Sequence, residues 1–144
     1  MKRHVLVVAL AACAAFSAQA RDTELHLPLQ DALNSADAKA KLTGEVKFFF
    51  GDQKHGAVAQ EMGSDVTNQK TNAFNKSDEE ACQWVFLSAM LQLQKRAKDL
   101  GADAVVDIQS FYKKDPFVSA TEYECHAGAL MAGVALKGRF VKLK

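Results

Sequence analysis

The chain has 144 residues, of which 49% are hydrophobic and 24% charged, and it contains only 2 prolines. These values are typical of one globular domain and exclude a disordered chain, a collagen-like repeat and a multidomain enzyme. The formal net charge of +1 excludes the strong basic field of a dedicated nucleic-acid-binding domain.

The first twenty residues predict an export signal. A basic start precedes an apolar run over residues 5–15, which is shorter than the ~20 residues needed to cross a bilayer. The segment ends at Ala18-Gln19-Ala20, the small-x-small pattern that signal peptidase cuts. We therefore expect residues 1–20 to be a signal peptide cleaved after Ala20, and residues 21–144 to form one periplasmic or secreted domain without a membrane span.

A second interpretation of the same segment concerns Cys13. Residues 10–13 resemble a lipobox, whose cysteine would be acylated and would anchor the protein to a membrane. The apolar segment continues beyond Cys13, which favours simple cleavage after Ala20 over a lipid anchor.

The first elements of the mature chain are short. Residues 25–29 predict an extended segment because their proline disfavours a helix. Apolar residues at helical spacing predict a short amphipathic helix over 30–41, and alternation predicts a strand over 43–50.

Next, residues 57–62 and 65–71 flank Gly63-Ser64. A glycine that begins a two-residue connection predicts a hairpin with a type II′ turn. The hairpin is rich in polar residues, which indicates a sheet edge exposed to water.

The strongest local signal predicts a long helix from Asp78 to about Leu100. Ser77 and the acidic residues after it form a capping box at the start. Gly101 supplies a left-handed cap at the end.

This helix has two apolar faces, although a surface helix needs only one. The first includes Cys82, and the second consists of Trp84, Leu87 and Leu91. Either the short N-terminal helix covers the second face, or another subunit does. We therefore assign Trp84, Leu87 and Leu91 to a candidate interaction surface, for self-association or for an envelope protein.

The remaining sequence predicts three strands, over residues 102–111, 118–126 and 130–143. In the first of them, we expect Ala104, Val106 and Ile108 to face the core. Together, the elements predict an α+β fold in which one long helix, about 78–100, packs on a largely antiparallel sheet of roughly five to six strands, with a short N-terminal helix.

Two cysteines, Cys82 and Cys125, remain after the predicted signal peptide is removed. In an exported protein, an even pair is most simply one disulfide. Both side chains are expected to point into the space between helix and sheet. Two free thiols or a thiolate metal site are the alternatives, and the lack of CxxC spacing disfavours a redox-active dithiol.

Glu122, Glu124 and His126 are the most suggestive polar cluster. On a strand they share one face, with about 6.8 Å between successive members. Two carboxylates and an imidazole suit a borderline divalent metal. The same pattern also describes the solvated face of an exposed strand, and acid–base chemistry is a weaker third interpretation.

The second candidate is the loop over residues 111–117, where Tyr112, Lys113 and Lys114 could contact a partner protein or a glycan. Alternatively, the two phenylalanines of this loop end their strands in the core while the lysines solvate the turn.

Other chemistry is not indicated. The chain has no phosphate-binding GxxxxGK[ST] or GxGxxG motif, no GxSxG elbow and no HExxH pair, so we expect no cofactor and no nucleotide chemistry. His26 and His55 have no recognisable partners in the sequence. We therefore predict a non-enzymatic binding or interaction module, with a metal-binding protein as the alternative and a small hydrolase as a weaker one.

The segment RAKDLGADAVVDI, residues 96–108, resembles the A-x-x-x-G-A-[ND]-A-V-V junction of small YbjQ-type bacterial domains and of the signalling domain of RcsF-type envelope-stress lipoproteins. Residues 70–88 and 123–138 also resemble exported proteobacterial proteins, some of which carry an excinuclease-like label. The lack of a phosphate-binding motif argues against that activity. The resemblance implies an α+β fold and an envelope location, without a reaction. The stress-sensor domain has two disulfides, whereas the mature chain here has cysteines for one.

Overall fold

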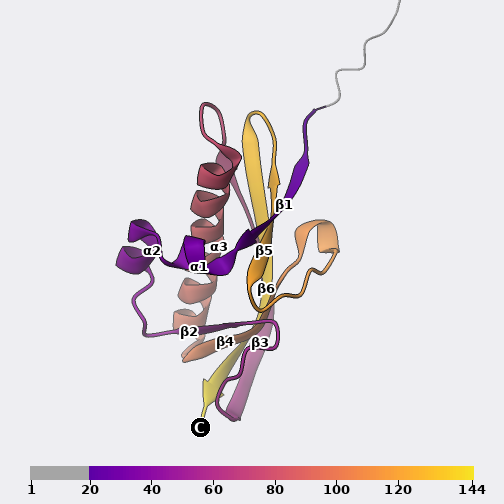
Figure 1. The fold of residues 1–144 in the computed structure, drawn as a ribbon. Helices are drawn as coiled ribbons and strands as arrows, with labels where there is room; N and C mark the ends of the chain where they lie inside the picture. Colours follow the sequence, from indigo (N-terminus) through magenta and orange to yellow (C-terminus); the bar gives the residue numbers. More distant parts are fainter. Residues whose placement is uncertain (1–19) are drawn as a thin grey trace, which may run out of the picture.

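The computed structural model describes residues 20–144 (Figure 1). The predicted signal peptide, apart from Ala20, and Cys13 lie outside the described residues. Within the described part, no helix has both the length and the apolar character needed to span a membrane.

The fold is α+β, with one long helix and a mostly antiparallel six-stranded sheet, as predicted. The strands are β1 (Thr23–Pro28), β2 (Lys47–Phe50), β3 (Val58–Asn72), β4 (Ala104–Ser110), β5 (Glu122–Ala127) and β6 (Met131–Leu143). The helices are α1 (Leu29–Leu33), α2 (Ala36–Lys41), α3 (Asp78–Leu100) and the 3₁₀ turn η1 (Tyr112–Lys114).

Strand β6 is the axis of the sheet. On one side it pairs with β3 along nearly its whole length. On the other side it pairs with β5 near its start and with β4 towards its end. Strand β1 extends the sheet beyond β5, and β2 extends it beyond β4 in the one parallel pairing of the described sheet.

Helix α3 lies along one face of this sheet (Figure 1), and the main core fills the space between them. Its bounds agree with the sequence prediction, and so do its caps. The Ser77 Oγ accepts a hydrogen bond from the Glu80 amide at 3.1 Å, and Gly101 has φ 74°. The predicted disulfide between Cys82 of α3 and Cys125 of β5 is present and joins the helix to the sheet, with the two Cα atoms 5.9 Å apart.

The predicted hairpin at Gly63-Ser64 is wrong. Strand β3 runs straight through this dipeptide, and the register of its pairing with β6 shifts between Glu61 and Ser64. Gly63 has φ 111°, so the glycine serves a β-bulge rather than a turn. Because β3 pairs only with β6 in the described sheet, its polar residues do lie along an edge.

The single N-terminal helix predicted over 30–41 is two helices, α1 and α2. The chain breaks at Asn34 and Ser35, where the Ser35 Oγ accepts a hydrogen bond from the Ala38 amide and starts the second helix. The following strand begins only at Lys47, after a bend at Gly44, whose φ is 79°.

The inward face of β4 also differs from the prediction. Asp107 has φ 51°, and the pairing with β6 shifts register there. Ile108 and Val105 therefore pack under α3, whereas Ala104 and Val106 belong to a second, smaller cluster. All three residues predicted to face the core are buried, but only Ile108 belongs to the main core.

Candidate metal site on the β1–β5 ribbon

Strands β1 and β5 place two histidines and two glutamates on one face of the sheet. In their antiparallel register Glu24 lies opposite His126, and His26 lies opposite Glu124. The intervening residues, such as Cys125, face α3 and the main core. Because side chains alternate along a strand, the four polar side chains project from the face that α3 does not cover.

The polar atoms of these side chains form a continuous chain of contacts. His26 Nε2 lies 3.1 Å from Glu24 Oε1 and 3.6 Å from Glu124 Oε2. The other carboxylate oxygen of Glu124 lies 2.9 Å from His126 Nε2. His126 Nδ1 in turn lies 3.0 Å from Asp22 Oδ1. Glu124 therefore bridges the two imidazoles.

The cluster has a buried end and an open end. The side chains of Glu124 and His126 are only 10% and 13% exposed, whereas those of Glu24 and His26 are 56% and 38% exposed. The Glu124 amide also donates a hydrogen bond to Ser110 Oγ at 2.9 Å, which ties this part of β5 to β4. An ion or small ligand could therefore enter on the side of Glu24 and His26.

The loop over residues 111–117 covers the cluster with two aromatic rings. Tyr112 stacks on His126 with ring centroids 3.8 Å apart, and Phe117 stacks on His26 at 4.0 Å. Lys113 Nζ lies 3.7 Å from Asp22 Oδ2 at one end of the cluster. The two features that the sequence presented separately, the polar strand face and the aromatic loop, thus belong to one site.

Glu24, His26 and Glu124 form a group that could hold a metal ion. Their ligand atoms lie within 4.8 Å of one another. Around a tetrahedral ion with bonds of about 2.1 Å, neighbouring ligand atoms are about 3.4 Å apart. The distances of 3.1 and 3.6 Å from His26 Nε2 to the two carboxylates are close to this value.

The ligand group differs from the one that the sequence suggested. Glu124 and His126 belong to the cluster, but Glu122 is exposed at the start of β5, opposite Pro28. Glu24 and His26 were missed. The sequence contains one pattern that points to these two residues: Glu-x-His occurs twice, at residues 24–26 and at residues 124–126. Antiparallel pairing of the two strands places each glutamate opposite the histidine of the other strand.

The second apolar face of α3 is partly covered within the chain. Leu87 is buried and Leu91 is half-buried, while Trp84 is 45% exposed. The Lys41 ammonium of α2 lies 4.8 Å from the centre of the Trp84 ring. A cleft of about 360 Å³ remains beside Trp84, between α3 and the start of α2.

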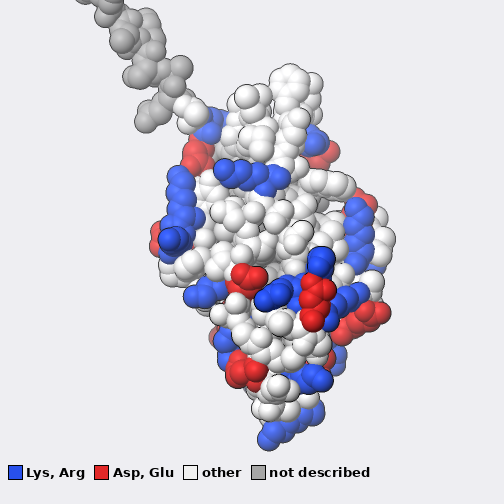
Figure 2. Space-filling model, turned by 180° about the vertical axis from the view of Figure 1, so that it is seen from behind, with Lys and Arg blue, Asp and Glu red and all other residues white. Residues whose placement is uncertain are grey.

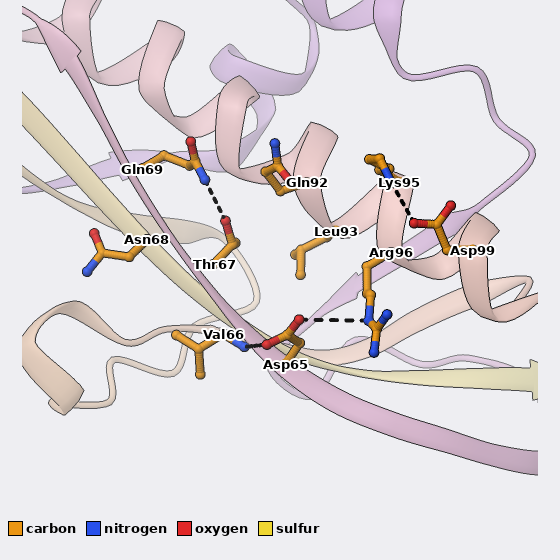
Figure 3. Close-up of a pocket in the computed structure, with 10 residues that line it drawn as sticks. All are labelled: Asp65, Val66, Thr67, Asn68, Gln69, Gln92, Leu93, Lys95, Arg96 and Asp99. Carbon is orange, nitrogen blue, oxygen red and sulfur yellow. Dashed lines mark hydrogen bonds and ion pairs between the residues drawn. The ribbon is translucent and has the colours of Figure 1, made fainter.

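A polar cleft of about 270 Å³ lies between α3 and the edge strand β3 (Figure 3). Its charged side chains pair with one another. Arg96 Nε lies 3.9 Å from Asp65 Oδ2, and Lys95 Nζ lies 2.6 Å from Asp99 Oδ2. This cleft therefore offers weaker ligand chemistry than the β1–β5 cluster.

One ion pair secures the strand that carries Glu24 and His26. The Arg21 guanidinium donates two hydrogen bonds to the Asp78 carboxylate, at 2.8 and 2.9 Å, and a third to the Gly128 carbonyl. The hydrogen bonds from Arg21 hold the pKa of Asp78 below its usual value. The beginning of β1 is thereby joined to the start of α3 and to the β5–β6 loop.

Comparison of the chain with protein-family models, with curated proteins and with solved structures finds no match. The resemblance to YbjQ-type domains and to the stress-sensor domain therefore stays a prediction.

Proposed function

We propose that this protein binds a divalent transition-metal ion through Glu24, His26 and Glu124. The observation that carries the proposal is the convergence of their three ligand atoms, from two paired strands, within 4.8 Å of one another. Two carboxylates and one imidazole suit borderline ions such as Zn²⁺, Cu²⁺ and Ni²⁺. Three protein ligands leave a position for water or for a small exchangeable ligand.

The contacts around the three ligands support the proposal. Ligating carboxylates and imidazoles in metalloproteins are usually oriented by hydrogen bonds and packing outside the first shell. Here His126 contacts the Glu124 oxygen that faces away from His26, and Phe117 packs flat against the His26 ring. Both ligands are therefore already oriented before an ion arrives.

We propose that the protein acts in the periplasm or outside the cell, as a binding protein rather than an enzyme. The Cys82–Cys125 disulfide supports an oxidising compartment. The apolar segment that ends at Ala18-Gln19-Ala20 supports export.

The test is calorimetric titration of the metal-free protein with zinc, copper and nickel salts. We expect one ion per chain for at least one of these metals. His26→Ala should weaken binding by about tenfold or more, since it removes the nitrogen ligand. His55→Ala is the matched control, because His55 lies after β2, outside the cluster, and should leave the affinity unchanged.

A second matched pair separates the proposed site from the group that the sequence suggested. Glu24→Gln should weaken binding, whereas Glu122→Gln, on the same two-stranded ribbon, should not. Absence of binding heat for all three metals contradicts the proposal, and so do equal effects of the two glutamate substitutions.

A second candidate function, interaction with another protein or with a second copy, is favoured by Trp84. A tryptophan that is 45% exposed beside a cleft is typical of an interface. Light scattering tests self-association: a dimer that Trp84→Ala dissociates would support it, and a wild-type monomer at all concentrations would contradict it.

A further inference from the structure

A small cavity lies where α1, α3 and β5 meet. Its volume is about 80 Å³, and it is lined by Leu27, Pro28, Asp31, Glu79, Gln83 and Tyr123. Asp31 comes from α1, Tyr123 from β5, and the other two polar residues from the first two turns of α3. Glu79 and Gln83 are four positions apart, so they lie on the same side of that helix. We call this space the Tyr123 cavity.

The cavity contains a buried polar atom without a partner. Tyr123 is 1% exposed, and its hydroxyl forms no hydrogen bond among the described residues. Burial raises the pKa of this hydroxyl, and the negative charges of Asp31 and Glu79 raise it further, so both carboxylates are near enough to act on it. Because buried polar groups are normally hydrogen-bonded, the hydroxyl is a candidate contact for an ion or a water molecule in the cavity.

The Tyr123 cavity carries two negative charges and no positive one. Asp31 and Glu79 form no ion pair within residues 20–144. No described Lys, Arg or His lines the cavity. Elsewhere on the surface, acidic side chains lie beside basic ones, as Figure 2 shows for one face of the molecule. Two like charges around one cavity repel each other, and a cation between them removes this repulsion.

We infer that the Tyr123 cavity binds one Ca²⁺ ion, independently of the proposed transition-metal site. Its polar side chains offer oxygen ligands only, from two carboxylates, the amide of Gln83 and the phenol of Tyr123. Ca²⁺ takes about six to eight oxygen ligands, some of them water, in a flexible geometry, whereas Mg²⁺ needs a near-ideal octahedron and Zn²⁺ prefers nitrogen and sulfur. Pockets for organic ligands have volumes of about 300 Å³ or more, so this cavity suits a single ion with its water molecules.

The Tyr123 cavity and the β1–β5 cluster lie on opposite faces of β5. Side chains alternate along a strand, so Tyr123 faces α3 and the main core, whereas Glu124 projects from the other face. An ion in the cavity joins three elements that are distant in the sequence. Oxygen-ligand sites of extracellular modules bind Ca²⁺ with dissociation constants of about 10⁻⁴–10⁻³ M. We expect an affinity in this range, because only two carboxylates contribute.

The test is terbium luminescence of the full chain. Tb³⁺ takes the oxygen ligands of Ca²⁺ and emits light when an adjacent phenol is excited. Trp84→Phe removes the only tryptophan and leaves Tyr112 and Tyr123 as the sensitising groups. In this background we expect emission that millimolar Ca²⁺ displaces. Tyr123→Phe should abolish the emission and Tyr112→Phe should preserve it, because Tyr112 stacks on the β1–β5 cluster.

Glu79→Gln should weaken Tb³⁺ binding by about tenfold or more, since it removes a charged ligand. Glu80→Gln is the matched control, because it removes a carboxylate of the same helical turn that lines the cleft beside Trp84 instead. The inference is overturned if no emission appears, if Ca²⁺ does not displace it, or if the two glutamate variants have equal effects. Emission that Tyr112→Phe abolishes, and Tyr123→Phe does not, also overturns it but leaves the transition-metal proposal intact.

A second measurement follows the wild type directly. An ion that binds only the folded protein raises its unfolding temperature, so Ca²⁺ should do so and NaCl at equal ionic strength should not. Asp31→Asn should remove most of this rise, and it is unlikely to be confused with misfolding because Asp31 is exposed. An equal rise in the wild type and in Asp31→Asn contradicts the inference.

Discussion

Tyr123 is the largest of the fully buried side chains, and its hydroxyl has no hydrogen-bond partner among the described residues. Burial raises the pKa of this hydroxyl well above its usual value, and the charges of Asp31 and Glu79 raise it further. In the folded protein the neutral form is therefore favoured. The contribution of the neutral Tyr123 hydroxyl to the unfolding free energy is complete below the pKa of tyrosine in the unfolded chain, about 10. This contribution is lost as the pH rises above that value.

We therefore predict that Tyr123→Phe changes the unfolding free energy by less than about 1 kcal/mol at pH 7, because the ring stays buried and only an unpaired hydroxyl is removed. Above about pH 10 the wild type should lose stability faster than the variant. Urea unfolding of both proteins from neutral to alkaline pH measures this difference. Parallel pH profiles would show that the Tyr123 hydroxyl titrates normally in the folded protein.

The dipeptide Gly63-Ser64 in strand β3 shows that one sequence pattern is compatible with two different backbone structures. Gly63-Ser64 between polar segments is typical of a hairpin turn, but a glycine at positive φ also suits a β-bulge in a continuous strand. The choice depends on β6, which is long enough to pair with residues on both sides of Gly63. That partner lies about seventy residues further along the chain, so local sequence patterns do not reveal it.

The bulge gives a prediction at the level of this strand. Gly63→Ala should lower the unfolding free energy by about 1 kcal/mol or more, because φ 111° is unfavourable for a residue with a Cβ atom. Gly56→Ala is the control, since a Cβ atom there meets open space without a positive φ. Denaturant unfolding measures both, and equal effects would contradict the conformational explanation.

The long helix was predictable because its signals are local. Ser77, the acids after it and Gly101 are all adjacent to the helix they delimit. The break between α1 and α2 was missed because Asn34 and Ser35 interrupt a pattern whose apolar residues continue at helical spacing. The inward face of β4 was missed because a bulge at Asp107 reverses the alternation that the prediction assumed.

In the whole molecule, the disulfide connects the helix to the strand that carries Glu124 and His126. Cys82 and Cys125 are separated by 43 positions. Closing a loop of this length stabilises a protein by about 4 kcal/mol in the chain-entropy model. The pairing could be predicted because only two cysteines follow the segment that we expect to be an export signal, and each lies on the apolar face of its element.

We predict that Cys82→Ala with Cys125→Ala lowers the unfolding free energy by about 4 kcal/mol. A reducing agent should lower the stability of the wild type by a similar amount and should not affect the double variant. Guanidinium unfolding with and without reductant provides the measurement. A double variant as stable as the oxidised wild type would show that the disulfide contributes little.

The candidate site could be predicted only in part. Its β5 half and its aromatic loop are recognisable as polar and aromatic patterns in the sequence. Its β1 half is about a hundred residues away, and only the pairing of the first strand with the fifth brings Glu24 and His26 to Glu124. Glu122 was included because strand alternation says which residues share a face, but not that the neighbouring strand places Pro28, which has no ligand atom in its side chain, opposite Glu122.

Imidazole ¹H–¹⁵N NMR of the metal-free protein during a zinc titration tests metal binding at the β1–β5 ribbon residue by residue. We expect the ring signal of His26 to change in proportion to added zinc and to stop changing at one equivalent. His126 should respond through Glu124, and His55 should stay unchanged. If His55 responds first, or if no imidazole signal changes at one equivalent, zinc is not bound by Glu24, His26 and Glu124.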